Sequence, residues 1–359
     1  MCETDKNCRQ EFADLLREIR ISPIYDEQEK LAVYSRLNGY IKENMPKSLF
    51  RYRTLADYSI EAFCKGFITV AKPSEMGDIF DSQISVDIKK VVSEIENMEH
   101  GIDGAADYLF KGNNIPNDFL RPFSRKIRRT YKSNRHRFKG NIRLKPETKL
   151  LANYFKDILS KRAEEKFGQT IDVLKQTGYI ACFCEDVCRL KMWSDYADKH
   201  KGYALEYDFE ALNAKFPTIE IADKRLQPDY IVLPVIYGEK YDSTEIIIYE
   251  LLDEQLREIG GREAYIKNPD ELWAIKGYLY KALDYESEAE WRLITPINGV
   301  TKNSKPYEKV YAKPKAVYYG TEMTEEMFQK LDAIAKENGI KRYRMRANPS
   351  DVSVEAMPL

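Results

Sequence analysis

The sequence from Tyr179 to Phe209 reads Y-I-A-C-F-C-E-D-V-C-R-L-K-M-W-S-D-Y-A-D-K-H-K-G-Y-A-L-E-Y-D-F. It begins with an apolar run, Tyr179 to Cys184, which is typical of a buried strand. It ends with an alternating run, Tyr203 to Phe209, which is typical of a second strand. We therefore expect two strands, joined by a polar helical turn, at the centre of the fold.

The connection between these two strands carries Trp193, Tyr196, His200 and Lys201. Loops positioned by rigid strands often hold binding residues, so these side chains are candidates for a ligand site. In the other interpretation, Trp193 and Tyr196 cap the core where the strands meet. The spacing alone favours this structural interpretation.

Several stretches resemble, in order, a bacterial family called domain of unknown function 2971. The stretches are Leu49–Leu55, Met76–Asp81, Cys182-Phe183, Met192–Gly202, Glu206-x-Asp208 and Glu288–Ile294. The family usually has Asn-Asp-Pro where this chain has Gly77-Asp78-Ile79. The family name implies no activity, so the functional hypotheses depend on the individual residues.

The sequence predicts a protein with neither a membrane-spanning segment nor a disulfide framework. The net charge is −1, the N-terminus is polar, and no run of about 18 apolar residues occurs. We therefore expect a cytoplasmic protein. The six cysteines are unevenly spaced, and Cys182 and Cys184 lie in an apolar strand, so we expect small buried thiols and no metal site.

The order of helical and strand patterns predicts an α+β fold with central mixed or antiparallel sheets. Residues 1–46 have the apolar spacing of amphipathic helices and are expected to form an N-terminal helical cap. Residues 47–359 are expected to form a single α+β domain. A charged, helical and basic insertion is expected within that domain at about residues 84–175.

Alternation from Tyr285 to Thr295 predicts a strand with one strongly charged face. That face would carry Glu286, Glu288, Glu290 and Arg292. Like charges at alternate positions destabilise a strand unless cations reach them from neighbours. Arg51 and Arg53 share a face of another alternating run and could supply those cations. A salt-bridge ladder on an exposed sheet remains the structural interpretation.

The sequence is also similar, more distantly, to ADP-ribosyltransferases in the order of its candidate residues. Arg51-x-Arg53 comes first, the regions Ser74 to Asp81 and Trp193 to Lys201 follow, and Glu288-x-Glu290 comes last. The resemblance implies cleavage of the nicotinamide–ribose bond of NAD as substrate, without a metal, as in a toxin or phage-defence effector. Such cleavage passes through an oxocarbenium-like state that a fixed carboxylate stabilises.

The resemblance implies a role for each candidate. Glu290 would face the ribose, and Glu288 would orient or deprotonate the acceptor. Bidentate arginine contacts would hold the pyrophosphate. The expected NAD-binding residues are Arg51, Arg53, Ser74, Trp193, Tyr196, His200 and Lys201.

A competing hypothesis comes from a basic block at residues 121–145, which contains no Asp or Glu. Its basic residues are Arg121, Arg125, Lys126, Arg128, Arg129, Lys132, Arg135, Arg137, Lys139, Arg143 and Lys145. Its positive charge suits an anionic partner, either a nucleic acid or an acidic protein surface, and interleaved aromatics are available to stack on bases. The chain would then be a nucleic-acid-binding or nuclease-like protein, or a non-catalytic toxin partner. Alternatively, the block is solvated or pairs with acidic segments of the same chain, such as residues 94–99.

The basic block yields a prediction about nucleic-acid affinity. Its candidate contact residues are Arg125, Lys126, Arg128, Arg129, Lys132 and Arg135. Replacing the first four by Glu should weaken nucleic-acid binding and reduce its salt dependence by roughly one unit of slope per lost phosphate contact. Filter binding over a salt series measures both effects. Unchanged affinity would mean that the block is solvated or self-paired.

Overall fold

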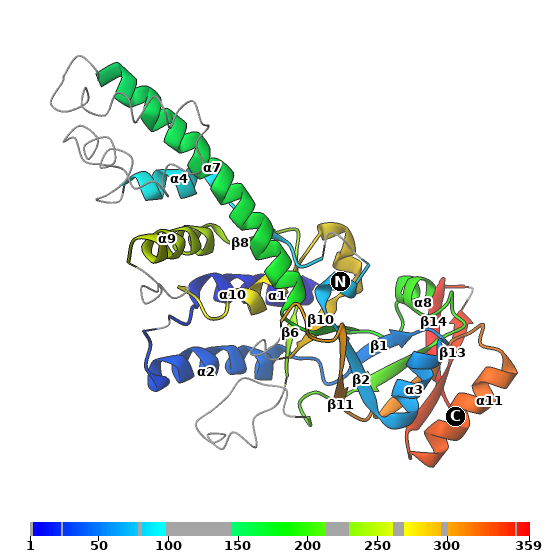
Figure 1. Ribbon diagram of the computed structural model, residues 1–359. Coiled ribbons are helices and arrows are strands. Elements are labelled where there is room, and N and C mark those ends of the chain that lie inside the picture. Colours follow the sequence, from blue (N-terminus) through cyan, green and yellow to red (C-terminus); the bar gives the residue numbers. More distant parts are fainter. Residues whose placement is uncertain are drawn as a thin grey trace. The chain divides into compact units, whose positions relative to one another are not determined.

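The computed structural model describes residues 3–22, 24–77, 81–97, 145–212, 230–260, 269–295, 301–348 and 350–359 (Figure 1). The chain divides into two compact units. The first comprises Met1–Ile84, Ile171–Tyr241 and Pro269–Leu359, and the second comprises Ser85–Thr170 and Asp242–Asn268. Helices and a mixed sheet occur together, which confirms the predicted α+β class. None of the helices within these described ranges is long and apolar enough to cross a membrane.

Ten strands of the described residues form one sheet in the first unit. They are β1 (Leu49–Arg53), β2 (Phe67–Ala71), β4 (Ile180–Cys184), β5 (Tyr203–Tyr207), β6 (Ile231–Pro234), β10 (Glu290–Ile294), β11 (Tyr307–Tyr311), β12 (Ala316–Tyr319), β13 (Lys341–Asn348) and β14 (Ser353–Pro358). The order is β11-β2-β4-β1-β5-β12-β13-β14, and β10 pairs with β4 and β6. The pairing of β12 with β13 is parallel and the other pairings in this sheet are antiparallel, so the sheet is mixed.

The sheet of the first unit has a core on each face. On one face, Phe63 of α3 (Asp57–Lys65) and Leu331 of α11 (Glu325–Glu337) pack against strand residues such as Leu205. On the other face, Trp193 of α8 (Leu190–Tyr196) packs edge-on against Tyr52, with ring centroids 5.2 Å apart. Apolar side chains of the central strands are therefore buried on both faces of the sheet.

Two N-terminal helices belong to the first unit, α1 (Glu3–Glu18) and α2 (Glu27–Asn44). They contact each other through stacked rings of Phe12 and Tyr40, whose centroids lie 4.7 Å apart. Asp26 begins α2 with a capping box, because its side chain accepts from the backbone of Glu29 and the Glu29 side chain accepts from the backbone of Asp26.

The remaining elements of the first unit are short. They are the 3-10 helices η1 (Pro73–Glu75) and η5 (Leu283–Glu288), the helix α10 (Trp273–Gly277), and the paired strands β7 (Ile236–Tyr237) and β9 (Tyr280–Lys281). The strands β3 (Ile84–Ser85) and β8 (Tyr241–Asp242) lie where the chain passes from one unit into the other.

The second unit is helical. It contains α4 (Ile88–Asn97), the larger part of α7 (Lys145–Gln176) and α9 (Thr244–Gly260). Apolar side chains of all three helices, including Val91, Ala163 and Ile247, form its core. Besides helices within the predicted insertion at about 84–175, this core includes α9, which lies outside that range.

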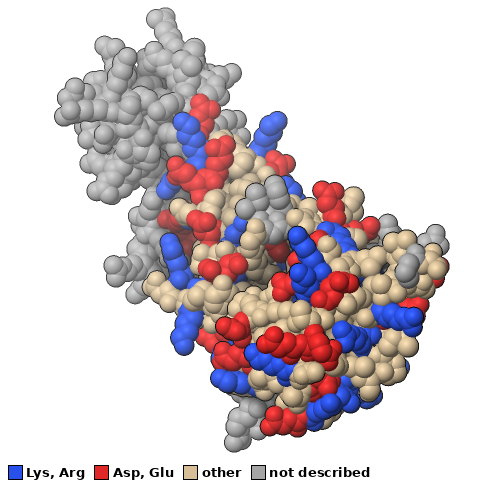
Figure 2. Space-filling model, turned by 90° about the vertical axis from the view of Figure 1, so that its right-hand side faces the viewer, with Lys and Arg blue, Asp and Glu red and all other residues tan. Residues whose placement is uncertain are grey.

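Positive and negative side chains are interspersed on the described surface that Figure 2 presents. This mixture agrees with the net charge of −1. This face of the described residues therefore exerts little long-range electrostatic attraction on either an anionic or a cationic partner.

A tight turn connects α8 to β5 and supports the end of β1. Asp198, Lys199 and His200 all have positive φ angles, between 47° and 67°. The Gly202 N–H then donates to the Ala197 carbonyl at 2.8 Å, and a Cβ atom on Gly202 would lie 2.2 Å from the Arg53 carbonyl oxygen. Only glycine allows this approach of the turn to β1.

The close approach at Gly202 predicts a loss of stability when a methyl group is added. Gly202→Ala should lower the free energy of unfolding by about 1–3 kcal/mol, because the backbone of β1 or of the turn must shift. Gly39→Ala is the matched control, since a Cβ atom there meets nothing within 4 Å. It lies inside α2 and should stabilise the protein by about 0.5–1 kcal/mol. Urea titrations of both variants measure the difference, and equal effects would contradict this account.

Candidate active-site cleft

A cleft lies in the first unit where strand pairing in the sheet is incomplete. One edge of β4 pairs with β2 at Ile180 and with β1 at Cys184. Among the described residues, no register partner occurs on this edge for the three positions between them. The cleft at this opening has a volume of about 650 Å³.

The residues lining the cleft come from β1, β2, β4, α8, β9, η5 and β10 and from the loop after β2. They are Phe50, Arg51, Tyr52, Arg53, Ala71, Met76, Gly77, Asp81, Ile180, Ala181, Cys182, Phe183, Cys184, Met192, Tyr196, Lys281, Tyr285, Glu288 and Glu290. The structure therefore places five of the predicted site residues around one cleft: Arg51, Arg53, Tyr196, Glu288 and Glu290.

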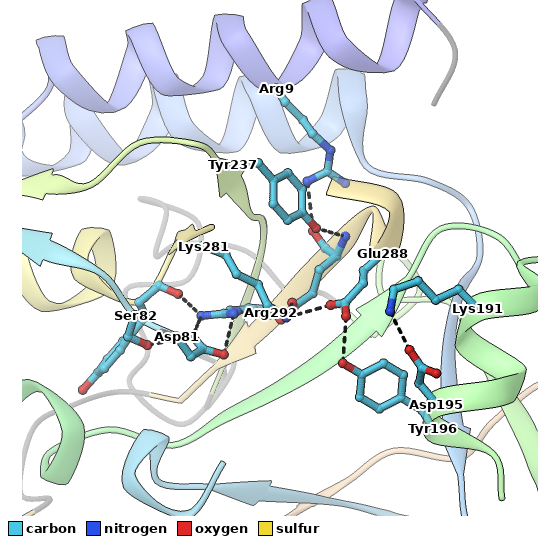
Figure 3. A network of polar contacts seen from close by, with 12 residues as sticks. Arg9, Asp81, Ser82, Lys191, Asp195, Tyr196, Tyr237, Lys281, Glu288 and Arg292 are labelled. Atoms are coloured by element: carbon cyan, nitrogen blue, oxygen red, sulfur yellow. Dashed lines mark hydrogen bonds and ion pairs between the residues drawn. The ribbon is translucent and has the colours of Figure 1, made fainter. Parts of the chain in front are cut away.

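The two glutamates share one lysine. Nζ of Lys281 donates to Oε2 of Glu288 at 2.7 Å and to Oε2 of Glu290 at 2.9 Å (Figure 3). All three side chains are buried, with at most 5% of each residue exposed. The hydroxyl of Tyr196 donates to the other oxygen of Glu288 at 2.7 Å. Two like charges therefore coexist in a buried place because a cation lies between them.

The same network continues along β10 through Arg292, which is fully buried. Its Nε donates to Oε1 of Glu290 at 2.7 Å, and its terminal nitrogens bind both carboxylate oxygens of Asp81 at 2.6 and 2.9 Å. A bidentate pair of this kind is among the strongest hydrogen-bonded ion pairs. Three carboxylates thus face two cations, so the network carries one net negative charge.

The network determines the protonation of its members. Burial alone would raise the pKa of Glu290, but the charges of Arg292 and Lys281 outweigh burial and lower it to about 2. Burial alone would lower the pKa of Lys281, but the negative charges of Glu290 and Glu288 outweigh burial and raise it. Glu290 is therefore an ionised carboxylate at neutral pH, as the stabilisation of a positive charge requires.

The predicted strand from Tyr285 to Thr295 is only partly correct. β10 begins at Glu290, whereas Glu286 and Glu288 lie in η5. Ala289 between them has a φ of 43°, which ends the helix and redirects the chain. Glu288 nevertheless reaches the same lysine as Glu290, through a turn rather than through alternation along one strand.

Arg51 and Arg53 do not supply the cations for the glutamates, contrary to expectation. Directly opposed residues share a face of a sheet, and Cys184 is opposed by both Phe50 and Glu290. Arg51 and Arg53 follow Phe50 at odd spacing and so lie on the other face of β1. The cations that face the glutamates are instead Lys281 and Arg292.

Both arginines at the cleft lack a carboxylate partner among the described residues. Arg51 donates to the carbonyl of Thr69 at 2.7 Å and thereby bridges from β1 to β2. Nε of Arg53 donates to the Ser59 hydroxyl at 3.0 Å, and its guanidinium lies over the ring of Tyr58. Burial and the nearby charge of Arg53 lower the pKa of Arg51 to about 9, so Arg51 remains cationic at neutral pH. Two uncompensated cations in a cleft favour an anionic ligand.

Helix α1 supports the glutamate strand from outside the cleft. Nη1 of Arg9 donates to the carbonyls of Val235 and Glu290 at 2.7 and 2.9 Å, and its other terminal nitrogen pairs with Glu185. The hydroxyl of Tyr237 accepts from the backbone N–H of Glu290 at 2.7 Å. Both backbone polar groups of Glu290 are thus held, which fixes the start of β10.

Four other predicted site residues lie outside the lining of this cleft. Trp193 is fully buried and donates from Nε1 to the Val187 carbonyl at 2.6 Å, as in the structural interpretation of that residue. The His200 N–H donates to the Trp193 carbonyl at 3.0 Å within the turn. Lys201 and Ser74 are exposed, and Ser74 lies in η1. The cleft gives no support to a binding role for these four residues.

The cysteines of β4 are free thiols at the cleft. Burial raises the pKa of Cys184 to about 12 and also raises that of Cys182. A thiol that stays protonated at neutral pH is a poor nucleophile, so cysteine catalysis is not favoured. Within the described ranges, no group of three or more His, Cys, Asp or Glu side chains is arranged to hold a metal ion.

Sequence reasoning missed Lys281, Asp81 and Arg9. Lys281 follows the apolar run Tyr278–Tyr280, and a lysine in such a run signals a buried partner of opposite charge. Asp81 ends one of the stretches that carry the family resemblance, but that resemblance implies no specific role for it. No local pattern marks Arg9. The six basic-block residues proposed to bind nucleic acid lie outside the described residues.

The fold and the cleft define an α+β protein with a buried ion network and, in the same cleft, two arginines that have no carboxylate partner among the described residues. A family model described as "Protein of unknown function (DUF2971)" matches residues 192–293, which confirms the family resemblance over that range. The match includes Tyr196, Lys281, Glu288, Glu290 and Arg292. No curated protein and no solved structure matches the chain.

The buried network predicts how Lys281 controls stability. Lys281→Met should lower the free energy of unfolding by about 3–5 kcal/mol at pH 7, because two buried carboxylates lose their shared cation. The exposed pair Lys191–Asp195 provides the control, and Lys191→Met should change stability by less than about 0.5 kcal/mol.

The loss of stability caused by Lys281→Met should also depend on pH. Because the pKa of Glu290 is lowered to about 2, its contribution in the wild type is complete above about pH 4.5 and is lost as pH falls towards 2. In Lys281→Met the paired carboxylates favour an extra proton, so the deficit should shrink between pH 7 and pH 5. Urea titrations at several pH values test this, and a deficit independent of pH would argue against the shared-cation account.

Proposed function

We propose that this chain is an ADP-ribosyltransferase-like enzyme that cleaves the nicotinamide–ribose bond of NAD. The observation that carries the proposal is that Glu288 and Glu290 line the same cleft as Arg51 and Arg53. NAD consumption fits the role of a toxin or phage-defence effector.

The charges that line the cleft are complementary to a dinucleotide with a cationic end and an anionic middle. The network that ends in Glu288 carries one net negative charge and suits the positively charged nicotinamide riboside. Arg51 and Arg53 have no carboxylate partner among the described residues and suit the pyrophosphate. The volume of about 650 Å³ is within the range of small-molecule and cofactor sites.

The proposed reaction uses the residues as follows. The bond between the ribose C1′ and the nicotinamide nitrogen breaks, and its electron pair leaves with neutral nicotinamide. The ionised Glu290 stabilises the positive charge that develops on the ribose. An acceptor hydroxyl, amine or water attacks C1′, and its proton passes to Glu288, which Tyr196 and Lys281 hold in place.

Binding of a nucleic acid at the basic block of residues 121–145 is a second candidate function. The observation that favours it is the density of Lys and Arg there without any Asp or Glu. It is compatible with NAD cleavage, since a nucleic acid could serve as acceptor. The salt-dependent binding test described for this block decides it.

The central prediction concerns turnover of NAD. Purified wild-type protein should release nicotinamide from NAD, either with water or with an added acceptor. Glu290→Gln should lower the rate by about a hundredfold or more, as expected for loss of a charge that stabilises the transition state. Chromatography of released nicotinamide measures the rate.

Stability must be measured on the same preparations, because Glu290→Gln weakens two buried ion pairs and should lower the melting temperature. Tyr196→Phe avoids this problem, since Tyr196 is 40% exposed and the variant keeps the Glu288 charge. It should lower the rate by about tenfold through loss of one charge-assisted hydrogen bond, with little change in melting temperature. If wild-type protein releases no nicotinamide with any acceptor, or if Glu290→Gln keeps full activity when folded, the proposed function is wrong.

A further inference from the structure

Strand β11 carries two exposed aromatic rings on one of its faces. Tyr307 and Tyr311 are 48% and 74% exposed. Alternation along the strand puts both rings on the same face as Lys309, which lies midway between them and is also exposed. The two tyrosines are about 13 Å apart along the strand. This face of β11 therefore presents an aromatic, a basic and a second aromatic side chain to solvent.

Phe67 of β2 holds two of these three side chains in place. Phe67 is buried and is opposed by Tyr311 across the strand pair. The Tyr311 ring packs against it with centroids 6.2 Å apart, and Nζ of Lys309 lies 4.2 Å from the centroid of the Phe67 ring. A side chain that is already oriented loses little conformational entropy when a ligand stacks on it. Tyr311 is therefore exposed and pre-organised at the same time.

The segment that contains β11 is strongly basic. Residues 301–315 contain five lysines and one acidic residue, Glu308, so the segment carries four net positive charges. The lysines are Lys302, Lys305, Lys309, Lys313 and Lys315, and all of them are exposed. Within the described ranges, their carboxylate partners are Glu61, 3.8 Å from Lys309, and Glu206, 3.0 Å from Lys315. The other three lysines have no carboxylate partner there, which favours an anionic ligand.

The backbone of this segment is anchored where the chain enters β11. Buried Lys72 donates from Nζ to three carbonyls of the segment at 3.0, 3.3 and 2.8 Å. The acceptors are Thr301, Lys302 and Ser304. The Tyr179 hydroxyl donates to the Lys305 carbonyl at 2.7 Å. The backbone that carries the lysines is therefore fixed beside the tyrosines, while the lysine side chains stay in water.

We propose that the face of β11 formed by Tyr307, Lys309 and Tyr311 binds single-stranded nucleic acid. Bases stack on the two rings, and a phosphate between them contacts Lys309. Lysines alone on the outermost strand of the described sheet would be explained by protection against unwanted strand pairing. Exposed tyrosines add apolar area and so oppose that purpose. Because the bases of a duplex are stacked on one another, a single strand is the fitting occupant.

This surface is separate from the basic block of residues 121–145, and the inference does not depend on NAD cleavage. The surface adjoins the cleft, because Tyr307 is opposed by Ala71, which belongs to the cleft lining. Lys309 is opposed by Thr69, whose carbonyl accepts from Arg51. A nucleic acid bound on β11 therefore lies beside the cleft.

Photocrosslinking locates the bound bases directly. Full-length wild-type protein is irradiated with a short oligothymidine that contains 5-iodouracil and, separately, with the corresponding oligouridine. Mass spectrometry of the digested protein then identifies the crosslinked residues. We expect crosslinks at Tyr307 and Tyr311 with single strands and none at these residues with the matching duplexes. Comparison of the two oligonucleotides shows whether DNA or RNA is preferred.

Variants of the two tyrosines test the contribution of stacking. Tyr307→Ala and Tyr311→Ala should each weaken oligonucleotide binding about fivefold or more, and the double variant about thirtyfold. Tyr307→Phe and Tyr311→Phe are matched controls, because they keep the stacking ring, and should bind within about twofold of wild type. Fluorescence anisotropy measures the affinities. Melting temperatures should change little, since both rings are exposed.

Three outcomes would overturn the nucleic-acid site on β11. One is the absence of oligonucleotide binding, which would leave a protein partner as the occupant of the tyrosines. Another is binding with crosslinks confined to other residues, such as the basic block. The third is an equal loss of affinity in the Phe and Ala variants, since stacking does not need the hydroxyl. Nicotinamide release with water as acceptor is measured without nucleic acid, so failure of this site is distinguishable from failure of the proposed function.

Discussion

The position of Lys281 between Glu288 and Glu290 is the interaction on which the site depends. Removing a carboxylate or an ammonium from water costs several kcal/mol, and the cost is recovered only when a partner of opposite charge is held close. Lys281 supplies that partner to both glutamates at once, and Arg292 and Asp81 extend the alternation of charge. The elements that carry these residues must therefore all be in place before any of the charges is tolerated. The exposed Lys191–Asp195 pair on α8 imposes no such condition, because water screens it.

The cleft lies where the pairing of β4 with its neighbouring strands is interrupted. β1 and β2 both pair with one edge of β4, but only at opposite ends of that strand. A complete strand at this position would fill the opening and hide both Cys182 and the approach to Glu290. Between Ile180 and Cys184 the described strands thus provide no register partner on this edge of β4, and the cleft there is lined by charged and aromatic side chains.

Sequence patterns identified the elements with local periodicity and missed those defined by long-range pairing. The apolar run at Ile180–Cys184 and the alternation of Leu49–Arg53 and Tyr203–Tyr207 predicted β4, β1 and β5, because one buried face imposes a period of two. The spacing of Glu288 and Glu290 fits that period and predicts one strand, whereas the left-handed conformation of Ala289 puts a turn between them. Lys281 could not be assigned as their partner, since nothing in the sequence indicates that β9 lies beside β10. Arg51 and Arg53 line the same cleft as the glutamates but lie on the other face of the sheet, and this could not be predicted because register across β4 cannot be derived from either strand alone.

The contact of Arg9 with the backbone of Glu290 has a consequence for the timing of folding during synthesis. Arg9 and Glu290 are 281 residues apart, and Asp81 and Arg292 are 211 apart. A ribosome has thus made most of the chain before either contact can form, and such distant contacts are slow to close. The nascent protein consequently has no assembled cleft until its own translation is nearly finished.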